Sequence, residues 1–216
     1  PTPASMSWCG RTRGSPLSLE ANQKLVAFAE AADLARLSWG DRATAELVVT
    51  RRQPSLTFGE VSVEPPPGAF LQATRRAEQA MREAVASWVG DTKRVADLFS
   101  GLGTLTIGRP WRTTLYESDK LSVAAVEAAG RRLGSGKLTA VRRDLFRNAL
   151  MASELDAFGA VVLDPPRAGA AAQCVELARS KVKRVVYASC DPGSFARDVR
   201  TLQDGGYRLE KLMPID

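Results

Sequence analysis

One cysteine of this sequence stands where a nucleophile would be expected. Cys190 lies in residues 187–192, directly after a short apolar run that predicts a strand and shortly before a helix predicted to begin near Ser194. Helix amides and basic neighbours lower the pKa of a thiol in such a place and favour the thiolate. The alternative is a small buried cysteine without chemistry. The neighbours of Cys190 favour the nucleophile.

Two glycines and two acids form a second group of candidate residues. Gly101 and Gly103 make a turn between a predicted strand and a predicted helix start, and Thr106 stands where the dinucleotide fingerprint has its third glycine. This favours S-adenosylmethionine over a pyrophosphate cofactor. At the end of the next strand, Glu117 can accept hydrogen bonds from both ribose hydroxyls, and Asp144 after the third strand can accept one from the adenine amino group. The alternatives are a purely structural turn and two solvated acids at strand ends.

A carboxylate followed by two prolines ends the fourth predicted strand. Asp164 emerges from the apolar residues 161–163, and the prolines stiffen the turn, which places the carboxylate at the cofactor and the reacting base. A similar motif of adenine and cytosine amino-methyltransferases continues with an aromatic residue that stacks on the base. Arg167 stands there in this sequence, which argues against N-methylation. The motif contains no cysteine either, which argues against methylation of cytosine C5.

The composition narrows the classes of function. The chain has no histidine, so acid–base chemistry would have to use carboxylates, cysteine, lysine or water. Three scattered cysteines argue against a disulfide scaffold or a zinc site, and no apolar run is long enough to span a membrane. The net charge of +6 predicts either a polyanionic partner or a basic surface without one. We expect a monomeric, cytoplasmic protein that holds no metal.

Apolar runs alternate with helical periodicity in residues 68–216. Strands are predicted at residues 94–99, 113–117, 138–142, 160–163 and 184–188. Helices are predicted at residues 72–89, 121–133, 170–179 and 194–203. This alternation predicts an α/β fold with a doubly wound, Rossmann-like parallel sheet, which binds ligands beyond the carboxyl ends of its strands.

A small α+β appendage is predicted in residues 1–67. It would begin with an irregular lead-in over residues 1–17, followed by a helix from Ser18 to near Gly40. Two strands are predicted at residues 45–50 and 56–63. The proline-rich residues 65–68 then interrupt the pattern, so we expect the domain boundary there. The appendage is a candidate for RNA contact.

Four motifs in this order resemble the uracil-5-methyltransferase family of tRNA and 23S rRNA. They occupy residues 70–72, 97–103, 163–169 and 189–198. The resemblance implies a class I methyltransferase fold, in which Cys190 is the nucleophile and S-adenosylmethionine is the methyl donor. It also implies that five residues contact this cofactor: Gln72, Phe99, Thr104, Glu117 and Asp164. Three positions depart from the family pattern, namely Thr74, Ser100 and Thr104. The N-terminal barrel and the iron–sulfur cysteines of many members have no counterpart in these 216 residues.

The family's chemistry follows from the same resemblance. The Cys190 thiolate would add to C6 of a uridine, C5 would take the methyl group, and loss of the C5 proton would release the cysteine. Arg167 is a candidate to stabilise charge on the uracil oxygen. The uridine would lie in an RNA loop or be flipped out of its stack, and residues 167–170 favour 23S rRNA over tRNA. The alternatives are an RNA cytosine-5 or base amino-methyltransferase and an RNA-binding module without catalysis.

The residue that removes the C5 proton is implied to lie elsewhere. In the resembled family it is a glutamate, in a segment that would follow Asp216. We therefore expect residues 68–216 to lack the C-terminal end of the catalytic domain. We also expect the 216-residue chain to bind cofactor and to stall as a trapped adduct, because Asp191 and Asp216 do not stand at the matching position.

Overall fold

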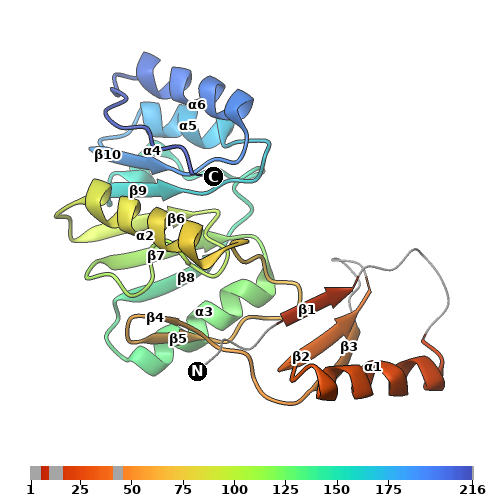
Figure 1. The fold of residues 1–216 in the computed structure, drawn as a ribbon. Coiled ribbons are helices and arrows are strands. Elements are labelled where there is room, and N and C mark those ends of the chain that lie inside the picture. Colours follow the sequence, from red (N-terminus) through yellow and green to blue (C-terminus); the bar gives the residue numbers. More distant parts are fainter. Residues whose placement is uncertain (1–5, 10–16, 41–45, 216) are drawn as a thin grey trace.

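The computed structural model describes residues 17–40 and 46–215, and the backbone of residues 6–9. Its main sheet has five parallel strands in the order β10-β9-β6-β7-β8 (Figure 1). These strands are β6 (Arg94–Leu98), β7 (Arg112–Glu117), β8 (Leu138–Arg142), β9 (Ala160–Leu163) and β10 (Arg184–Tyr187). Every strand lies within one residue of its predicted range at each end. The predicted α/β fold with a parallel sheet is confirmed.

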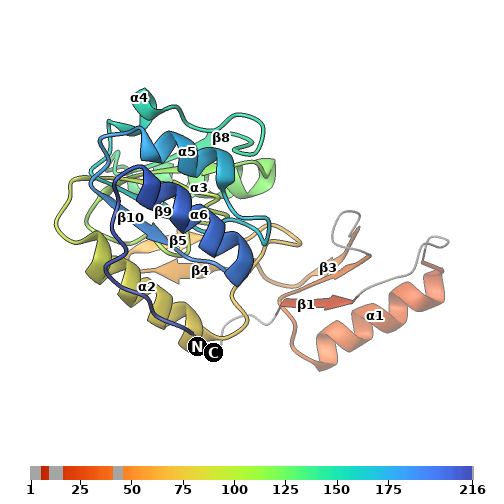
Figure 2. The ribbon, with the colours of Figure 1, turned by 90° about the horizontal axis from the view of Figure 1, so that it is seen from above.

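Helices cover both faces of this sheet, because its strands are apolar on both sides. Val162 of β9 packs in one hydrophobic cluster with Val85 of the helix that precedes β6. The adjacent Val161 points to the opposite face, where it packs with Leu177. The helices on the Val162 face are α2 (Arg75–Val89) and α3 (Lys120–Leu133), and those on the Val161 face are α4 (Ala152–Leu155), α5 (Ala171–Ala178) and α6 (Pro192–Asp204) (Figure 2). Within the described part of the chain, no helix is both long and apolar enough to cross a membrane.

The order of the strands reverses its direction at β6. The chain extends the sheet through β7 and β8 on one side of β6, and through β9 and β10 on the other. Such a switch point leaves a crevice beyond the carboxyl ends of the two central strands, here β6 and β9. Backbone hydrogen bonds join the start of the loops after β9 and β10 to the end of the neighbouring strand. The amide of Asp164 donates to the carbonyl of Leu98 (3.2 Å), and that of Ala188 donates to the carbonyl of Leu163 (2.8 Å).

A β-hairpin from the N-terminal part of the chain joins the core of the main sheet. Its strands are β4 (Leu56–Phe58) and β5 (Val61–Val63), which pair antiparallel across a turn at Gly59, whose φ is +62°. The prediction of one strand over residues 56–63 is wrong, because this turn folds the run back on itself. Val63 is fully buried in the same cluster as Leu115 of β7. The boundary near residue 67 stays a prediction, although this hairpin packs on the sheet that follows it.

A second, smaller sheet lies at the N-terminal end. It has the order β1-β2-β3 and is covered by a helix (Figure 1). The elements are β1 (Met6–Cys9), α1 (Leu19–Ala31), β2 (Arg36–Trp39) and β3 (Glu46–Thr50). The predicted irregular lead-in is therefore wrong at residues 6–9, whose parallel pairing with β2 could not be seen in the local pattern. Residues 1–5, 10–16 and 41–45 lie outside the described part, and with them the predicted strand start at Ala45.

The predicted helix from Ser18 to Gly40 is wrong in its second half. Ser18 caps the helix as predicted, but the helix ends at Ala31. Asp33 then adopts a φ of +49°, a conformation that stops a helix and that aspartate tolerates better than most residues. Its carboxylate accepts hydrogen bonds from Arg51 and Arg52 at the end of β3. Tertiary contacts of the second sheet therefore decide where this helix ends.

The segment after β6 differs from the prediction as well. The sequence predicts a helix start after the glycine turn, whereas residues 101–108 form successive turns without a regular helix. Gly108 has a φ of +78°, and a Cβ there would meet the carbonyl of Phe58 at 2.2 Å, so close packing on the hairpin bends the segment. Arg82 of α2 donates to the carbonyls of Thr104 and Ile107. One guanidinium thus satisfies two carbonyls of these turns.

Candidate functional site

Glu117 binds the glycine turn from the neighbouring strand. One oxygen of its carboxylate accepts a hydrogen bond from the amide of Gly101 (2.9 Å). The other oxygen accepts from the amides of Ser118 (2.7 Å) and Asp119 (2.8 Å). The predicted cofactor residue thus lies at the carboxyl edge of the sheet, and its charge is held against the turn by three backbone amides.

The two glycines of the turn have different surroundings. A Cβ on Gly103 would meet the side chains of Leu115 and Ile107 at 2.4 to 2.7 Å, so this glycine is needed for packing of the turn on β7. A Cβ on Gly101 would meet nothing within 4 Å. Both have positive φ, of +53° at Gly101 and +72° at Gly103. Of the two, only Gly101 borders open space that a ligand could occupy.

Asp97 is a site residue that the sequence analysis did not single out. Its side chain is 1% exposed, and one oxygen accepts a hydrogen bond from the Thr106 hydroxyl. The other oxygen is buried without a hydrogen-bond partner among the described residues, as is the nearby Ser100 hydroxyl. Burial raises the pKa of Asp97 to about 7, and the charges of Asp164 and Glu117 add to this rise. The sequence indicated Asp97 only through its position, because a charged residue is unusual inside a largely apolar strand.

Asp164 brings a second carboxylate to the same edge. It directly follows β9, and burial raises its pKa to about 6. Its charge acts on Asp97, the penultimate residue of the neighbouring strand β6. Asp97, Asp164 and Glu117 therefore make this part of the switch point strongly electronegative. A cationic ligand would relieve the cost of keeping these groups ionised in a poorly solvated place.

An aromatic pair borders the glycine turn on the side of β8. Phe99 has a φ of +60°, and its ring lies 5.2 Å from that of Phe146, which is 54% exposed. Phe146 was not predicted as a site residue, because it belongs to no periodic pattern. Asp144 accepts hydrogen bonds from the amides of Phe146 (3.0 Å) and Arg147 (3.3 Å). The predicted adenine contact of Asp144 stays a prediction, and the observed contacts of this carboxylate are with its own turn.

The two remaining predicted cofactor residues, Thr104 and Gln72, lie in different segments. Thr104 is partly buried, and its carbonyl is held by Arg82. Gln72 is partly buried in the segment that leads to α2, two residues before the helix cap Thr74. Thr74, one of the three positions that depart from the pattern of the resembled family, caps α2 through its hydroxyl, which accepts from the amide of Ala77 (3.1 Å).

Cys190 lies in the loop between β10 and α6 and is exposed. The alternative of a small buried cysteine is therefore wrong for this residue, whereas it describes Cys174, whose pKa burial raises to about 12. The following residue, Asp191, caps α6 by accepting from the amide of Ser194 (2.8 Å). These bonds from Ser194 lower the pKa of Asp191, and the charge of Arg167 lowers it further. Arg167 and the Cys190 loop are thus neighbours at one edge.

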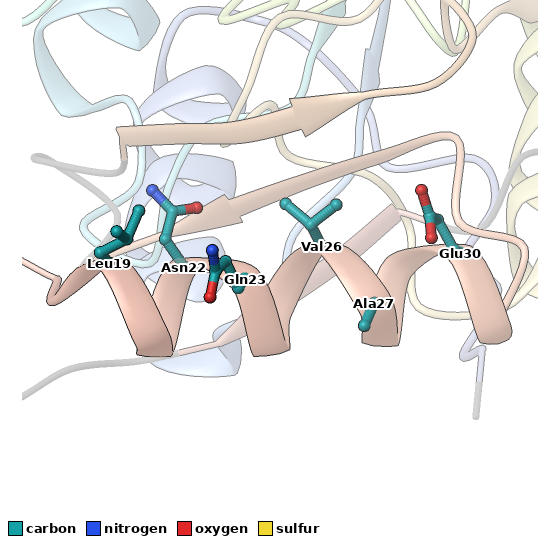
Figure 3. A pocket seen from close by; sticks show the side chains of 6 residues that line it. All are labelled: Leu19, Asn22, Gln23, Val26, Ala27 and Glu30. Atoms are coloured by element: carbon teal, nitrogen blue, oxygen red, sulfur yellow. The ribbon is translucent and has the colours of Figure 1, made fainter.

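A shallow pocket elsewhere in the molecule contains none of these groups. It lies on α1 (Figure 3), which is away from the main sheet (Figure 1). Its lining consists of Leu19, Asn22, Gln23, Val26, Ala27 and Glu30. With one carboxylate and no nucleophile among these side chains, this pocket offers no chemistry comparable to that of the sheet edge.

Comparisons with known proteins point to one family. The model of the family described as tRNA (uracil-5-)-methyltransferase matches residues 118–216. An uncharacterized RNA methyltransferase of Rhizobium meliloti is 52% identical over 174 residues, which are 79% of this chain and 42% of that protein. A 23S rRNA (uracil(1939)-C(5))-methyltransferase of Aeromonas salmonicida is 36% identical over 170 residues, which are 76% of this chain and 39% of that protein. The chain thus spans half or less of the length of these relatives.

A solved structure shares the fold across nearly the whole chain. It is the tRNA (uracil-54, C5)-methyltransferase of Pyrococcus abyssi in complex with S-adenosyl-L-homocysteine. The TM-score is 0.71, with 22% sequence identity over 95% of this chain and 50% of that protein. At this identity the match supports the fold alone.

Proposed function

Because this chain belongs to the RNA uracil-5-methyltransferase family, we propose that it transfers a methyl group from S-adenosylmethionine to C5 of a uridine in RNA, with Cys190 as covalent nucleophile. One observation carries the proposal. An exposed thiol after β10 and a glycine turn accompanied by the acids Asp97, Glu117 and Asp164 lie at the same carboxyl edge of one parallel sheet. The thiol suits attack on a base, and the acids suit a cationic methyl donor.

The residues present fit this cofactor. The unpartnered oxygen of Asp97 and the unpartnered Ser100 hydroxyl are acceptors that a ligand amino group would satisfy. We propose that the carboxylate of Glu117, which borders the turn at Gly101, accepts from the ribose hydroxyls, and that the ring of Phe99 supplies an apolar surface for the cofactor. We propose Gln72, Thr104, Asp144 and Asp164 as the further cofactor contacts. When bound, S-adenosylmethionine supplies an electrophilic methyl group on a positively charged sulfur.

The chain's own residues would act on the base. The Cys190 thiolate forms a bond to C6 of the uracil, and the electron pair of the C5–C6 double bond moves toward C5 and the neighbouring carbonyl. Arg167, next to this loop, stabilises the negative charge on the uracil oxygen. C5 is then nucleophilic enough to take the methyl group. Loss of the C5 proton restores the double bond and expels the thiolate.

We propose a 23S rRNA as the substrate, in agreement with the name of the Aeromonas relative. The net charge of +6 suits a phosphate backbone. The base must leave its stack to reach a thiol at the sheet edge, so a loop or a flipped uridine is the expected target. Action as a monomer in the cytoplasm without a metal, and RNA contact by the N-terminal unit, stay predictions.

The proposal is tested by locating the methyl group. The protein, produced at the full length of its gene, is incubated with labelled S-adenosylmethionine and with 23S rRNA or tRNA transcripts, and nuclease digests are analysed by mass spectrometry. We expect 5-methyluridine from 23S rRNA, and none with the Cys190→Ala variant. A methyl group on cytosine or adenine, or RNA binding without any methylation, would contradict the proposal. Methylation of tRNA alone would contradict the choice of 23S rRNA.

A further inference from the structure

A second buried aspartate lies next to the Cys190 loop and has no part in the proposed chemistry. Asp198 of α6 is fully buried. One oxygen accepts hydrogen bonds from the amide of Ala170 (2.6 Å) and the hydroxyl of Tyr187 (2.7 Å). The other oxygen pairs with the guanidinium of Arg197 (2.8 Å). Its ionised form is therefore satisfied on both oxygens.

The partners of Asp198 belong to the two loops that carry the proposed reacting groups. Ala170 ends the loop that begins with Asp164 and contains Arg167. Tyr187 is the last residue of β10, three positions before Cys190. One carboxylate on α6 thus connects the loop of the base-stabilising arginine with the strand that presents the nucleophile.

Two further contacts join α6 to the Arg167 loop. Arg197 also donates to the carbonyl of Ala168 (2.9 Å), in the same loop as Arg167. Gly169 has a φ of +77°, and a Cβ there would meet Arg197 and Asp198 side-chain atoms at 2.5 Å. The loop can therefore approach the carboxylate only with a glycine at this position.

We propose that Asp198 is a positioning residue for the methyl transfer, which holds the Arg167 loop and the Cys190 loop in a fixed relation through Ala170 and Tyr187. This inference rests on the proposed function. A buried carboxylate requires one arrangement of its donors, because a donor that moves away leaves a buried acceptor unsatisfied. Nucleophilic addition depends on such an arrangement, since small misplacements of reacting groups slow a reaction strongly.

Two tyrosines allow a matched test. Tyr187→Phe keeps the ring and removes only the hydroxyl that reaches Asp198. Tyr207→Phe is the control, because its hydroxyl donates to the carbonyl of Val182 (2.7 Å), in the loop before β10, and it packs against the same hydrophobic cluster as Tyr187. Both variants lose the hydroxyl of a half-buried tyrosine, which in Tyr207 also has a longer contact to the carbonyl of Leu177 (3.4 Å). If the role of Tyr187 were purely structural, both variants would form the covalent adduct at similar rates.

The measurement is the rate of covalent adduct formation. The protein at the full length of its gene is mixed with saturating S-adenosylmethionine and with 23S rRNA transcribed with 5-fluorouridine, whose fluorine cannot leave as a proton does. The protein–RNA band that survives denaturation is followed in time. We expect Tyr187→Phe to slow adduct formation about 10- to 100-fold and Tyr207→Phe to stay within about twofold of the wild type. The dissociation constant for S-adenosylhomocysteine and the loss in melting temperature should be similar in both variants.

The possible outcomes separate the two proposals. An active wild type with equal rates for Tyr187→Phe and Tyr207→Phe would overturn the positioning role alone. A rate loss accompanied by an equally weakened affinity for S-adenosylhomocysteine would overturn it too, since the damage would then reach the cofactor turn. A wild type that forms no adduct would overturn the proposed function, and the positioning role with it. A selective slowing in Tyr187→Phe, and a larger one in Asp198→Asn, would support the inference.

Discussion

Two buried aspartates at the carboxyl edge of the main sheet differ in how fully their oxygens are hydrogen-bonded. Asp97, on the side of the glycine turn, has one oxygen without a partner and a pKa raised to about 7 by burial. Asp198, on the side of Cys190, accepts hydrogen bonds on both oxygens. A buried acid with free acceptor capacity is costly until a ligand arrives, whereas a fully bonded one holds its surroundings in place. This contrast agrees with our proposals that the first side receives the cofactor and that the second holds the reacting groups.

The largest expected effect separates methyl transfer, which depends on Cys190, from cofactor binding at the glycine turn. Cys190→Ala should lower methyl transfer at least about 10³-fold, because no other thiol is exposed among the described residues. Binding of S-adenosylmethionine, measured by calorimetry, should change little, since the thiol belongs to the nucleophile side. A variant that methylates RNA at the wild-type rate would remove the covalent mechanism.

The two aspartates should respond to neutral substitutions with opposite signs. In the folded protein Asp97 holds a proton up to about pH 7, whereas in the unfolded chain it loses this proton near its ordinary pKa of 3.8. The free energy of unfolding therefore falls as the pH rises from about 4 to about 7, and the full cost remains above that range. Asp97→Asn should remove this cost and stabilise the protein at pH 8, while it weakens cofactor binding.

Asp198→Asn is the counterpart of that variant. It puts an amide, one end of which donates instead of accepting, in place of a fully buried carboxylate, so one of its donors loses its acceptor and the protein should be destabilised by about 1 to 3 kcal/mol at neutral pH. Urea denaturation of both variants at pH 5 and pH 8 tests the pair. If Asp97→Asn were less stable than the wild type at pH 8, the proposed contrast between the two sites would be wrong.

A smaller effect is expected at Glu117. Its carboxylate should accept hydrogen bonds from the cofactor ribose, so Glu117→Ala should weaken S-adenosylmethionine binding by about 1 to 3 kcal/mol, as is usual for charged hydrogen bonds. Asp156→Ala serves as the control, because that carboxylate lies before β9, at the opposite edge of the sheet, and accepts from the amide of Lys181 (2.7 Å). An unchanged dissociation constant for Glu117→Ala by calorimetry would exclude Glu117 from the cofactor site.

The smallest expected effect is on the free energy of unfolding. It concerns Gly101 in the glycine turn and Gly169 in the Arg167 loop. Both Gly101 and Gly169 have positive φ, so alanine at either position should cost about 1 kcal/mol in backbone strain. Alanine at Gly169 must in addition displace Arg197 and Asp198, whereas alanine at Gly101 meets nothing within 4 Å. Gly169→Ala should therefore lower the free energy of unfolding more than Gly101→Ala, by about 1 kcal/mol or more. Equal values in urea denaturation would show that the contact at Gly169 relaxes without cost.

Local patterns were sufficient for the main sheet and for part of its site. The strands of the sheet are short apolar runs between turn residues, so each could be located from its own residues. Because parallel strands bring their carboxyl ends to one edge, the residues that follow them were expected together, and Glu117, Asp164 and Cys190 do lie at that edge.

Patterns were misleading where a distant segment decides the local structure. The helix predicted up to Gly40 stops at Ala31, where Asp33 binds arginines from the end of β3. The strand predicted over residues 56–63 folds into a hairpin against α3 and β7. In each case the local propensity was compatible with two conformations, and burial against another element selected one of them.

Residue types and their order thus determined the fold class, the edge at which chemistry can occur and the candidate nucleophile, because hydrophobic periodicity and turn chemistry act over a few residues. Only the tertiary structure decided which acid keeps an unpartnered oxygen and which is fully bonded. Asp97 and Asp198 are both single acids in the sequence, and no local pattern distinguishes them. Their difference arises from partners such as Ala170, which lies 28 residues from Asp198 along the chain and meets it only once the sheet has formed.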